Sequence, residues 1–251
     1  MVSPLLYFSW GFKLLKRIIP DLSLASFRKR LWLRSSRPSR RLTVEKMVAT
    51  HFQLFSSRTH VNYPAFLIVL RHLNELPARI FETGTSAWGT DSTRLWAKYV
   101  QTFGGSLQSV DLRTEPSITL GDLGPRVTFA VSDSVNFMAS TFEEGEVPTL
   151  DFVYLDSFDV DFADALPAAT HCLDEWNGIR DQVSPGGMVL IDDTPRNMRY
   201  LGDDVQPGGL DFIRRYGVVP GKGSFVVKAI ADDPDWQIVY HQYSLLLQKN
   251  R

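Results

Sequence analysis

The sequence predicts an α/β fold with a mostly parallel sheet, and three observations support this fold class. Five apolar runs of strand length each end in an acid, and segments long enough for helices separate them. A glycine-rich turn follows the first run, and the chain closes with two more strand-like segments. The 251 residues are enough to bury a full core, and their composition is that of an ordinary globular protein.

The first predicted strand passes into a glycine-rich turn and then a helix within residues 80–92, IFETGTSAWGTDS. Its apolar start leads into Glu82, and Gly84 and Gly89 supply the backbone freedom that a turn around a ligand needs. One of residues 90–92 can cap the helix that follows. Turns of this kind also occur for packing reasons alone, so the ligand interpretation depends on the rest of the chain.

Aspartates end the four later strand-like runs. Asp111 follows the second run, Asp133 the third, Asp156 and Asp159 the fourth, and Asp192 and Asp193 the fifth. Ligands of open parallel sheets bind outside the carboxyl ends of the strands, so these acids are expected to converge on one crevice. A single aspartate at a strand end is as readily a helix cap or a turn residue, but acids at five strand ends favour a shared site.

Two amphipathic segments predict helices that pack on the sheet. Residues 63–76 are expected to cover the sheet edge before the first strand. Between the fourth and fifth strands, an apolar stripe of helical spacing comprises Leu166, Ala169, Leu173, Trp176, Ile179 and Val183. His171 and Glu175 fall on the opposite face, so they are expected to form a surface pair one helical turn apart rather than a catalytic site.

The C-terminal segments predict an antiparallel hairpin. Residues 221–230, GKGSFVVKAI, and residues 236–248, WQIVYHQYSLLLQ, have the apolar and β-branched content of two long strands. The polar residues 232–235, DDPD, would form the turn between them.

The order of these motifs resembles that of the class I S-adenosylmethionine-dependent methyltransferases over roughly residues 62–248. The resemblance implies a Rossmann-like three-layer sandwich, in which a mostly parallel seven-stranded sheet ends in an antiparallel hairpin. A nicotinamide dinucleotide fold is the rival for a glycine-rich turn with a downstream acid. The predicted hairpin and the lack of length for a separate substrate domain favour the methyltransferase resemblance.

The resemblance also implies which residues hold S-adenosylmethionine. The Asp111 carboxylate would accept hydrogen bonds from the ribose hydroxyls, the first motif would lie under the methionine part and ribose, and residues 132–134 would contact adenine. The implied cofactor residues are Glu82, Gly84, Thr85, Ser86, Gly89, Asp111, Ser132, Asp133, Ser134 and Asp156. The TSAWG turn is longer than the family pattern, which leaves the part played by residues 86–88 open.

A narrower resemblance is to the metal-assisted O-methyltransferases, of the catechol and macrocin types. It implies that Asp156, Asp192 and Asp193 hold Mg²⁺, a hard cation that prefers oxygen ligands. The ion would hold the acceptor hydroxyl and lower its pKa, while Asp156 and Asp159 would be the catalytic acids, with Asp159 as the general base. The alternative is that the DDTP segment is an ordinary turn.

The loop from residue 194 to residue 222 is the expected acceptor side of the site. It is rich in Gly, Pro and Asp, and Arg196, Asn197, Arg199 and Tyr200 could hold a polar acceptor such as a sugar. A solvated surface loop is the alternative.

The first 50 residues predict a basic amphipathic extension, and residues 51–251 the methyltransferase domain. The extension holds 11 Lys and Arg against 2 acids, and the rest of the chain 16 against 26. Its apolar start is too short and too charged to span a membrane. It is expected to join a second subunit in a homo-oligomer, to form a lid, or to contact a membrane surface peripherally; no nucleic acid partner is expected.

The expected function is transfer of a methyl group from S-adenosylmethionine to a hydroxyl of a small molecule, with a sugar or glycoconjugate precursor favoured as acceptor. The alternatives are a metal-independent methyltransferase with another acceptor atom, and a non-catalytic scaffold. Cys172 is the single cysteine, which excludes an intramolecular disulfide and fits a cytoplasmic protein.

Overall fold

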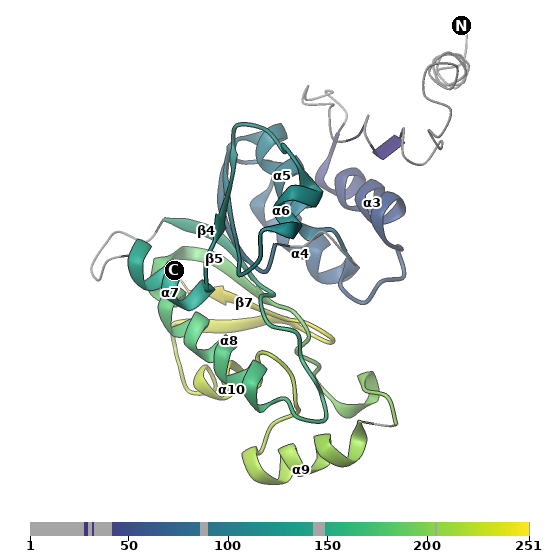
Figure 1. The fold of residues 1–251 in the computed structure, drawn as a ribbon, viewed down its shortest axis with the longest axis vertical. Helices are drawn as coiled ribbons and strands as arrows, with labels where there is room; N and C mark the ends of the chain where they lie inside the picture. The colour runs from purple at the N-terminus through teal and green to yellow at the C-terminus, as the bar shows by residue number, and fades with distance from the viewer. Residues whose placement is uncertain are drawn as a thin grey trace, which may run out of the picture.

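The structure is a computed structural model that describes residues 42–85, 90–142, 149–203 and 205–250, together with Arg28, Lys29 and Trp32 (Figure 1). The predicted amphipathic segment at the start of the chain, with its oligomer, lid and membrane roles, lies outside the described residues. Within the described part, no helix has both the length and the apolar character needed to cross a bilayer.

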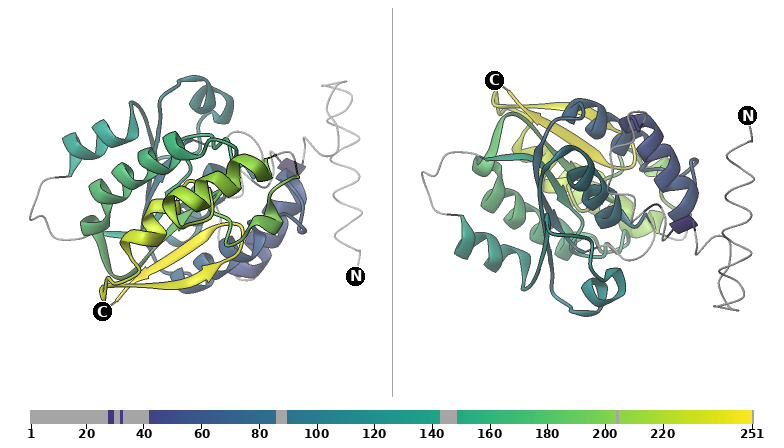
Figure 2. Two further views of the ribbon diagram at one scale, coloured as in Figure 1. Left: turned by 90° about the horizontal axis from the view of Figure 1, so that it is seen from below. Right: turned by 90° about the horizontal axis from the view of Figure 1, so that it is seen from above.

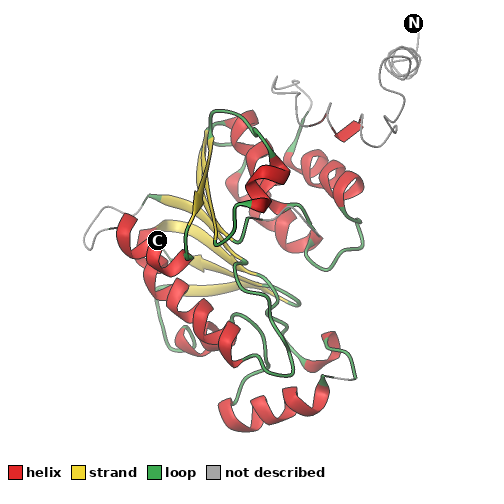
Figure 3. Ribbon diagram, in the orientation of Figure 1, coloured by secondary structure: helices red, strands yellow, loops and turns green. Residues whose placement is uncertain are grey.

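A seven-stranded sheet, yellow in Figure 3, forms the centre of the molecule. Its strands lie in the order β3-β2-β1-β4-β5-β7-β6. The strands are β1 (Ala78–Thr83), β2 (Gly105–Asp111), β3 (Val127–Val131), β4 (Leu150–Leu155), β5 (Val183–Ile191), β6 (Trp236–His241) and β7 (Leu245–Lys249). The first five strands pair in parallel, and β7 is antiparallel to both β5 and β6. The predicted mostly parallel sheet with a C-terminal antiparallel hairpin is confirmed.

Helices cover both faces of the sheet (Figures 1 and 2). The first face carries α3 (Val44–Phe55), α4 (Tyr63–Leu73) and α5 (Ser92–Phe103), and the second α7 (Ser134–Thr141), α8 (Leu166–Ile179) and α10 (Ser224–Ala229). The remaining helices are α6 (Glu115–Leu120), α9 (Gln206–Tyr216) and the short η1 (Arg180–Gln182) and η2 (Met198–Tyr200).

The two cores form because successive side chains of the central strands alternate between the two faces of the sheet. Phe152 and Tyr154 of β4 pack under the first helical layer, whereas Val153 and Leu155 pack under the second. All four side chains are fully buried. Because successive side chains of a strand point to opposite faces, one apolar run serves both layers, which gives the predicted three-layer sandwich.

The first core corrects the predicted place of α4, which covers the face of the sheet and not its edge. Phe66 lies with its ring centroid 4.8 Å from that of Trp96 in α5 and 5.5 Å from that of Tyr154 in β4, a central strand. Helix α3 spans residues 50 and 51, where the domain boundary was expected, and buries Phe52 in the same core.

The hairpin lies later in the chain than predicted. Residues 224–229 form helix α10 and not a strand, and both strands of the hairpin come from residues 236–249. Val226 and Ile230 are buried four residues apart and pack in the core under α8. This helical spacing of the buried positions outweighs the β-branched content of the segment.

Gly84 allows the loop after β1 to pack on the end of β4. It adopts a φ of +76°, and a Cβ atom there would lie 2.2 Å from the Asp156 carbonyl oxygen. Its N–H donates to the Val110 carbonyl of β2 at 2.8 Å. Only glycine fits both the backbone conformation and the space.

We predict that Gly84→Ala destabilises the protein by more than about 3 kcal/mol, because the new methyl group forces backbone apart as well as straining φ. Gly217→Ala is the matched control: Gly217 also has a φ of +76°, with nothing within 4 Å of its added Cβ. It should cost about 1 kcal/mol. Urea unfolding of both variants measures the difference, and equal costs would refute the close-approach argument.

Candidate functional site

A cavity of about 360 Å³ opens at the carboxyl ends of the parallel strands. This volume lies in the range of small-molecule sites. The predicted site residues on its wall are Gly84, Thr85, Asp111, Asp156, Asp159, Asp192 and Asp193. The strand-end acids of β2, β4 and β5 thus converge on one crevice, as the sequence predicts.

Glu82 lies beneath the first loop and not on the cavity wall. Its buried carboxylate accepts hydrogen bonds from the hydroxyls of Ser92 at 2.7 Å, Thr93 at 2.6 Å and Ser109 at 2.7 Å. Burial raises the pKa of Glu82 to about 7, although the three hydroxyls lower it. Glu82 therefore joins β1, β2 and the start of α5 under the glycine turn, where it supports the loop.

Asp111 lies on the cavity wall at the end of β2. Its Oδ1 accepts a hydrogen bond from the Arg113 N–H at 2.8 Å, which fixes the carboxylate. A carboxylate held by backbone at this position suits a ligand with two hydroxyl donors, such as the ribose expected from the sequence.

The residues expected near adenine are placed away from the cavity wall. Asp133 caps α7 by accepting from the Asn136 N–H at 2.9 Å, and Ser134 lies 3.1 Å, Oγ to Nε2, from His171. Ser132 and Asp133 share the carboxyl end of β3 with Ser134. Ser86 and Gly89 of the first motif lie outside the described residues.

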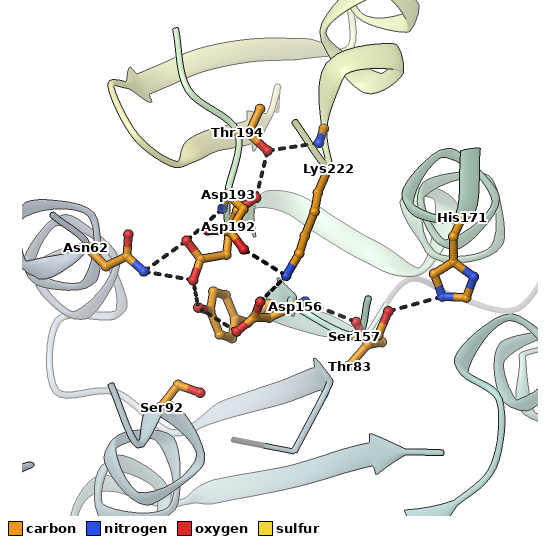
Figure 4. Close-up of polar contacts among 12 residues, drawn as sticks. Asn62, Thr83, Ser92, Asp156, Ser157, His171, Asp192, Asp193, Thr194 and Lys222 are labelled. Carbon is orange, nitrogen blue, oxygen red and sulfur yellow. Dashed lines mark hydrogen bonds and ion pairs between the residues drawn. The ribbon is translucent and has the colours of Figure 1, made fainter. Parts of the chain in front are cut away.

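The predicted pair on α8 is formed, but its acid is buried. His171 Nε2 lies 3.6 Å from Glu175 Oε1, and the Glu175 side chain is only 2% exposed. Ser157, on the cavity wall, donates to Glu175 at 2.7 Å. It also lies 3.1 Å from His171 Nε2 (Figure 4). The pair therefore faces inward, where it supports the loop after β4.

Asp192 is the most enclosed acid of the cavity wall. Asn62 Nδ2 donates to both of its oxygens, at 2.9 and 2.7 Å, and Tyr154 OH donates to Oδ2 at 2.6 Å. The Asp193 N–H adds a bond to Oδ1 at 2.8 Å. Asp193 itself has a φ of +42°, a region that a non-glycine residue occupies at a cost.

A buried lysine lies among the three expected metal ligands (Figure 4). Lys222 Nζ contacts Asp156 Oδ1 and lies 3.3 Å from Asp193 Oδ2, and its side chain is 4% exposed. Burial lowers the pKa of Lys222, but the surrounding carboxylates outweigh it and raise the pKa above its ordinary value. Lys222 is therefore an ammonium.

The Asp156 and Asp192 carboxyls differ from free carboxyls because they lie close together in a mostly enclosed crevice. Burial raises the pKa of Asp156, opposed by Lys222 and reinforced by Asp192. Burial also raises the pKa of Asp192, with the neighbouring Asp193 charge acting in the same direction. Like charges in one crevice disfavour full ionisation of the acids, and the positive charge of Lys222 opposes this effect.

In this arrangement the three acids do not fit a divalent ion. Lys222 already pairs with two of them, and protein donors bind the third. Among the residues that the structure describes, no group of three or more His, Cys, Asp or Glu side chains is arranged to hold a metal.

A second cavity of about 250 Å³ adjoins the first and shares His60, Val61 and Tyr243 with it. Its wall also carries Tyr200, Tyr240, Gln242, Arg58, Thr59 and Pro64. Tyr200 was expected near the acceptor, and its hydroxyl donates to Gln242 at 2.6 Å. Arg199 donates to Asn197 at 2.9 Å instead of entering either cavity wall.

Several residues of the site were missed by sequence reasoning. Lys222, Asn62, Tyr154 and Tyr243 hold the acids, and apart from the Tyr154–Asp156 contact they lie 29 to 130 positions from their partners in the chain. The one local signal was the pair of glycines around Lys222, in a segment interpreted as a strand. Asp159, the expected base, lies on the wall of the first cavity.

No protein-family model matches this chain, and no curated protein matches it in sequence. Solved structures do match it in fold. The MycE methyltransferase from the mycinamycin biosynthetic pathway, in complex with Mg, SAH and mycinamycin VI, is 19% identical with a TM-score of 0.58, over 85% of this chain and 56% of that one. A second crystal form of MycE with Mg and SAH is 17% identical with a TM-score of 0.57, over 85% of this chain and 55% of that one.

The chain thus spans little more than half the length of the MycE chains that it matches. At these identities the likeness establishes the fold: the chain has the Rossmann-like fold of the S-adenosylmethionine-dependent methyltransferases, as the resemblance in its motifs implied.

We predict that Glu82 makes stability depend on pH. Its folded pKa of about 7 lies above the ordinary 4.5, so its contribution is fully present below about pH 4.5 and is lost as pH rises through about 7. Relative to Glu82→Gln, the wild type should lose on the order of 2 kcal/mol of unfolding free energy between about pH 5 and 8. Urea unfolding across this range measures the loss, with the exposed Glu115→Gln as control. A difference that stays flat with pH would contradict the prediction.

Proposed function

We propose that this chain is an S-adenosylmethionine-dependent methyltransferase that methylates a hydroxyl of a small molecule. The observation that carries the proposal is the cavity at the carboxyl ends of β1, β2, β4 and β5, with Gly84 and Asp111 on its wall. On this fold, that is where a nucleotide cofactor binds.

The first loop suits the methionine part and ribose of the cofactor, and Asp111 suits its ribose hydroxyls. Gly84 has a positive φ and no side chain, so the backbone can pack against Asp156 and leave room for a ligand. The Asp111 carboxylate, which accepts a hydrogen bond from the Arg113 N–H, would also accept hydrogen bonds from the two ribose hydroxyls. Glu82 would act from beneath, by holding the loop through the Ser92 and Thr93 hydroxyls.

Methyl transfer is a single displacement. The acceptor oxygen attacks the methyl carbon, the C–S bond breaks as the O–C bond forms, and the sulfonium becomes a neutral thioether. The hydroxyl proton passes to the Asp159 carboxylate, which lies on the cavity wall three residues after Asp156. The protein contributes alignment and a base, and no covalent intermediate is needed.

The second cavity is the observation that supports a ring-shaped polar acceptor, such as a sugar or a glycoconjugate precursor, in this proposal. Tyr200, Tyr240 and Tyr243 supply faces that can pack on a ring and hydroxyls that can bond to it. Because Tyr243 also lines the first cavity, a ring in the second would direct a hydroxyl toward the acids.

Magnesium assistance was implied by the narrower resemblance, but it is not part of this proposal. The ion pairs of Lys222 with Asp156 and Asp193 favour the metal-independent alternative. The acceptor atom in that alternative need not be a hydroxyl oxygen.

We predict that purified protein binds S-adenosylmethionine with a micromolar Kd and that Asp111→Asn weakens binding at least about tenfold, about 1.4 kcal/mol, by removing a charged acceptor. Isothermal titration calorimetry measures both, with Asp211→Asn, on the exposed side of α9, as control. If folded wild-type protein does not bind the cofactor, the methyltransferase proposal fails and the scaffold alternative takes its place.

We predict that Asp159→Asn lowers kcat by about 10²-fold or more while the Kd for S-adenosylmethionine stays within about twofold, because a general base acts on the chemical step. Methyl transfer from labelled cofactor to a panel of sugar acceptors provides the assay. A variant with unchanged kcat would show that Asp159 is not the base.

A further inference from the structure

We propose that Lys222 takes the place of a divalent ion in this site, so that its ammonium holds Asp156 and Asp193 and methyl transfer needs no metal. The catalytic part of this inference rests on the proposed function, whereas the exclusion of the ion concerns binding alone. Lys222 is not among the residues that line either described cavity. It is therefore a positioning residue that acts through the two aspartates.

The ammonium lies where the carboxylates face one another. Lys222 Nζ contacts Asp156 Oδ1 and lies 3.3 Å from Asp193 Oδ2 (Figure 4). The Lys222 side chain is only 4% exposed, so almost no solvent reaches it. A divalent ion at the same place would meet this positive charge at short range in a buried environment.

Protein donors surround the three carboxylates. Each oxygen of Asp156, Asp192 and Asp193 lies within hydrogen-bond or ion-pair distance of a donor in the described part of the chain, and the single Tyr154 hydroxyl proton serves either Asp156 Oδ2 or Asp192 Oδ2. The donors are Lys222 Nζ, Tyr154 OH, Asn62 Nδ2, Tyr243 OH and the Asp193 N–H. Each oxygen of Asp156 and Asp193 keeps a second lone pair, so the exclusion of a metal depends on the ammonium: an ion that bridges Asp156 and Asp193 would have to displace Lys222 from between them.

Backbone hydrogen bonds hold the loop that carries Lys222 against residues 193 and 194. The Lys222 N–H donates to the Asp193 carbonyl at 3.0 Å, and the Gly223 N–H donates to Thr194 Oγ1 at 2.9 Å. A Cβ on Gly221 would lie 2.6 Å from the Asp193 carbonyl oxygen, and one on Gly223 would lie 2.8 Å from Thr194 Oγ1. The two glycines thus allow the backbone to dock directly on residues 193 and 194.

The far side of this docked loop is fixed as well. The Ser224 hydroxyl donates to the Val219 carbonyl at 2.6 Å and to the Gly221 carbonyl at 2.8 Å. Thr194, which accepts from Gly223, donates to the Asp192 carbonyl at 2.8 Å. Lys222 is therefore part of a fixed loop that includes the acids, and not a long surface side chain that folds inward when an ion is absent.

Titration with Mn²⁺, followed by calorimetry and by the electron paramagnetic resonance of the free ion, tests the inference without cofactor or acceptor. We expect wild-type protein to show no site with a Kd below about 1 mM, and Lys222→Met to gain a 1:1 site at least about tenfold tighter. Lys228→Met, which removes an exposed lysine of α10, should behave as wild type. Lys222→Arg keeps the charge and should also exclude the ion.

Two results would overturn the inference. One is a 1:1 Mn²⁺ site in wild-type protein that Asp192→Asn removes, because the ion would then displace Lys222. The other is a folded Lys222→Met protein that still binds no Mn²⁺. If Lys222→Met does not fold by circular dichroism, Lys222→Gln replaces it, since the amide keeps a donor without the charge.

A second arm tests the catalytic part. Turnover by wild-type protein should be unchanged, within about twofold, after treatment with a chelator and on addition of Mg²⁺. Lys222→Met should lose kcat at least about tenfold with the Kd for S-adenosylmethionine nearly unchanged, and Mn²⁺ should restore part of the loss. Wild-type turnover that a chelator abolishes would overturn the inference. Absence of cofactor binding would instead reject the proposed function and leave the Mn²⁺ titration decisive.

Discussion

The charge balance around Lys222 is the constraint on which the site depends. Three carboxylates meet at the ends of β4 and β5, Asp192 buried and the other two mostly enclosed, and this enclosure would be costly without a counter-charge. Lys222 arrives on a loop that follows η2 and α9, Asn62 comes from the start of α4, and Tyr243 from the turn before β7. The acid cluster therefore holds together segments from both ends of the domain, and the rest of the cavity is arranged around it.

A second polar centre lies beneath the glycine turn, and the two centres are joined through backbone. Glu82 accepts hydrogen bonds from hydroxyls of β2 and α5. Two residues later, Gly84 packs against the Asp156 carbonyl. The Asp156 N–H donates to the Thr83 carbonyl at 3.0 Å, so backbone joins the end of β1 to the end of β4. This bond ties the loop expected to hold the cofactor to the acids expected to meet the acceptor, and an in-line displacement requires these groups to be aligned.

The sequence was sufficient for the features that depend on local periodicity. Apolar runs that end in acids predicted the parallel strands and placed Asp111 and Asp156 at one edge, because parallel strands share their carboxyl ends. Lys222 could not be found this way, since it meets Asp156 across 66 positions with no spacing rule to indicate the contact. The α10 segment was misassigned because its β-branched residues resemble a strand, and Glu175 because α8 packs on the loop after β4 as well as on the sheet.

One cavity is proposed to bind S-adenosylmethionine beside an acid cluster whose cation is Lys222. The decisive measurement is a crystal structure of the protein grown with S-adenosylhomocysteine and Mn²⁺, with anomalous data at the manganese edge. We expect the nucleoside over Gly84 with its ribose on Asp111, and no anomalous peak among Asp156, Asp192 and Asp193. A manganese peak there with Lys222 displaced, or a cavity without the nucleoside, would refute the corresponding proposal for this site.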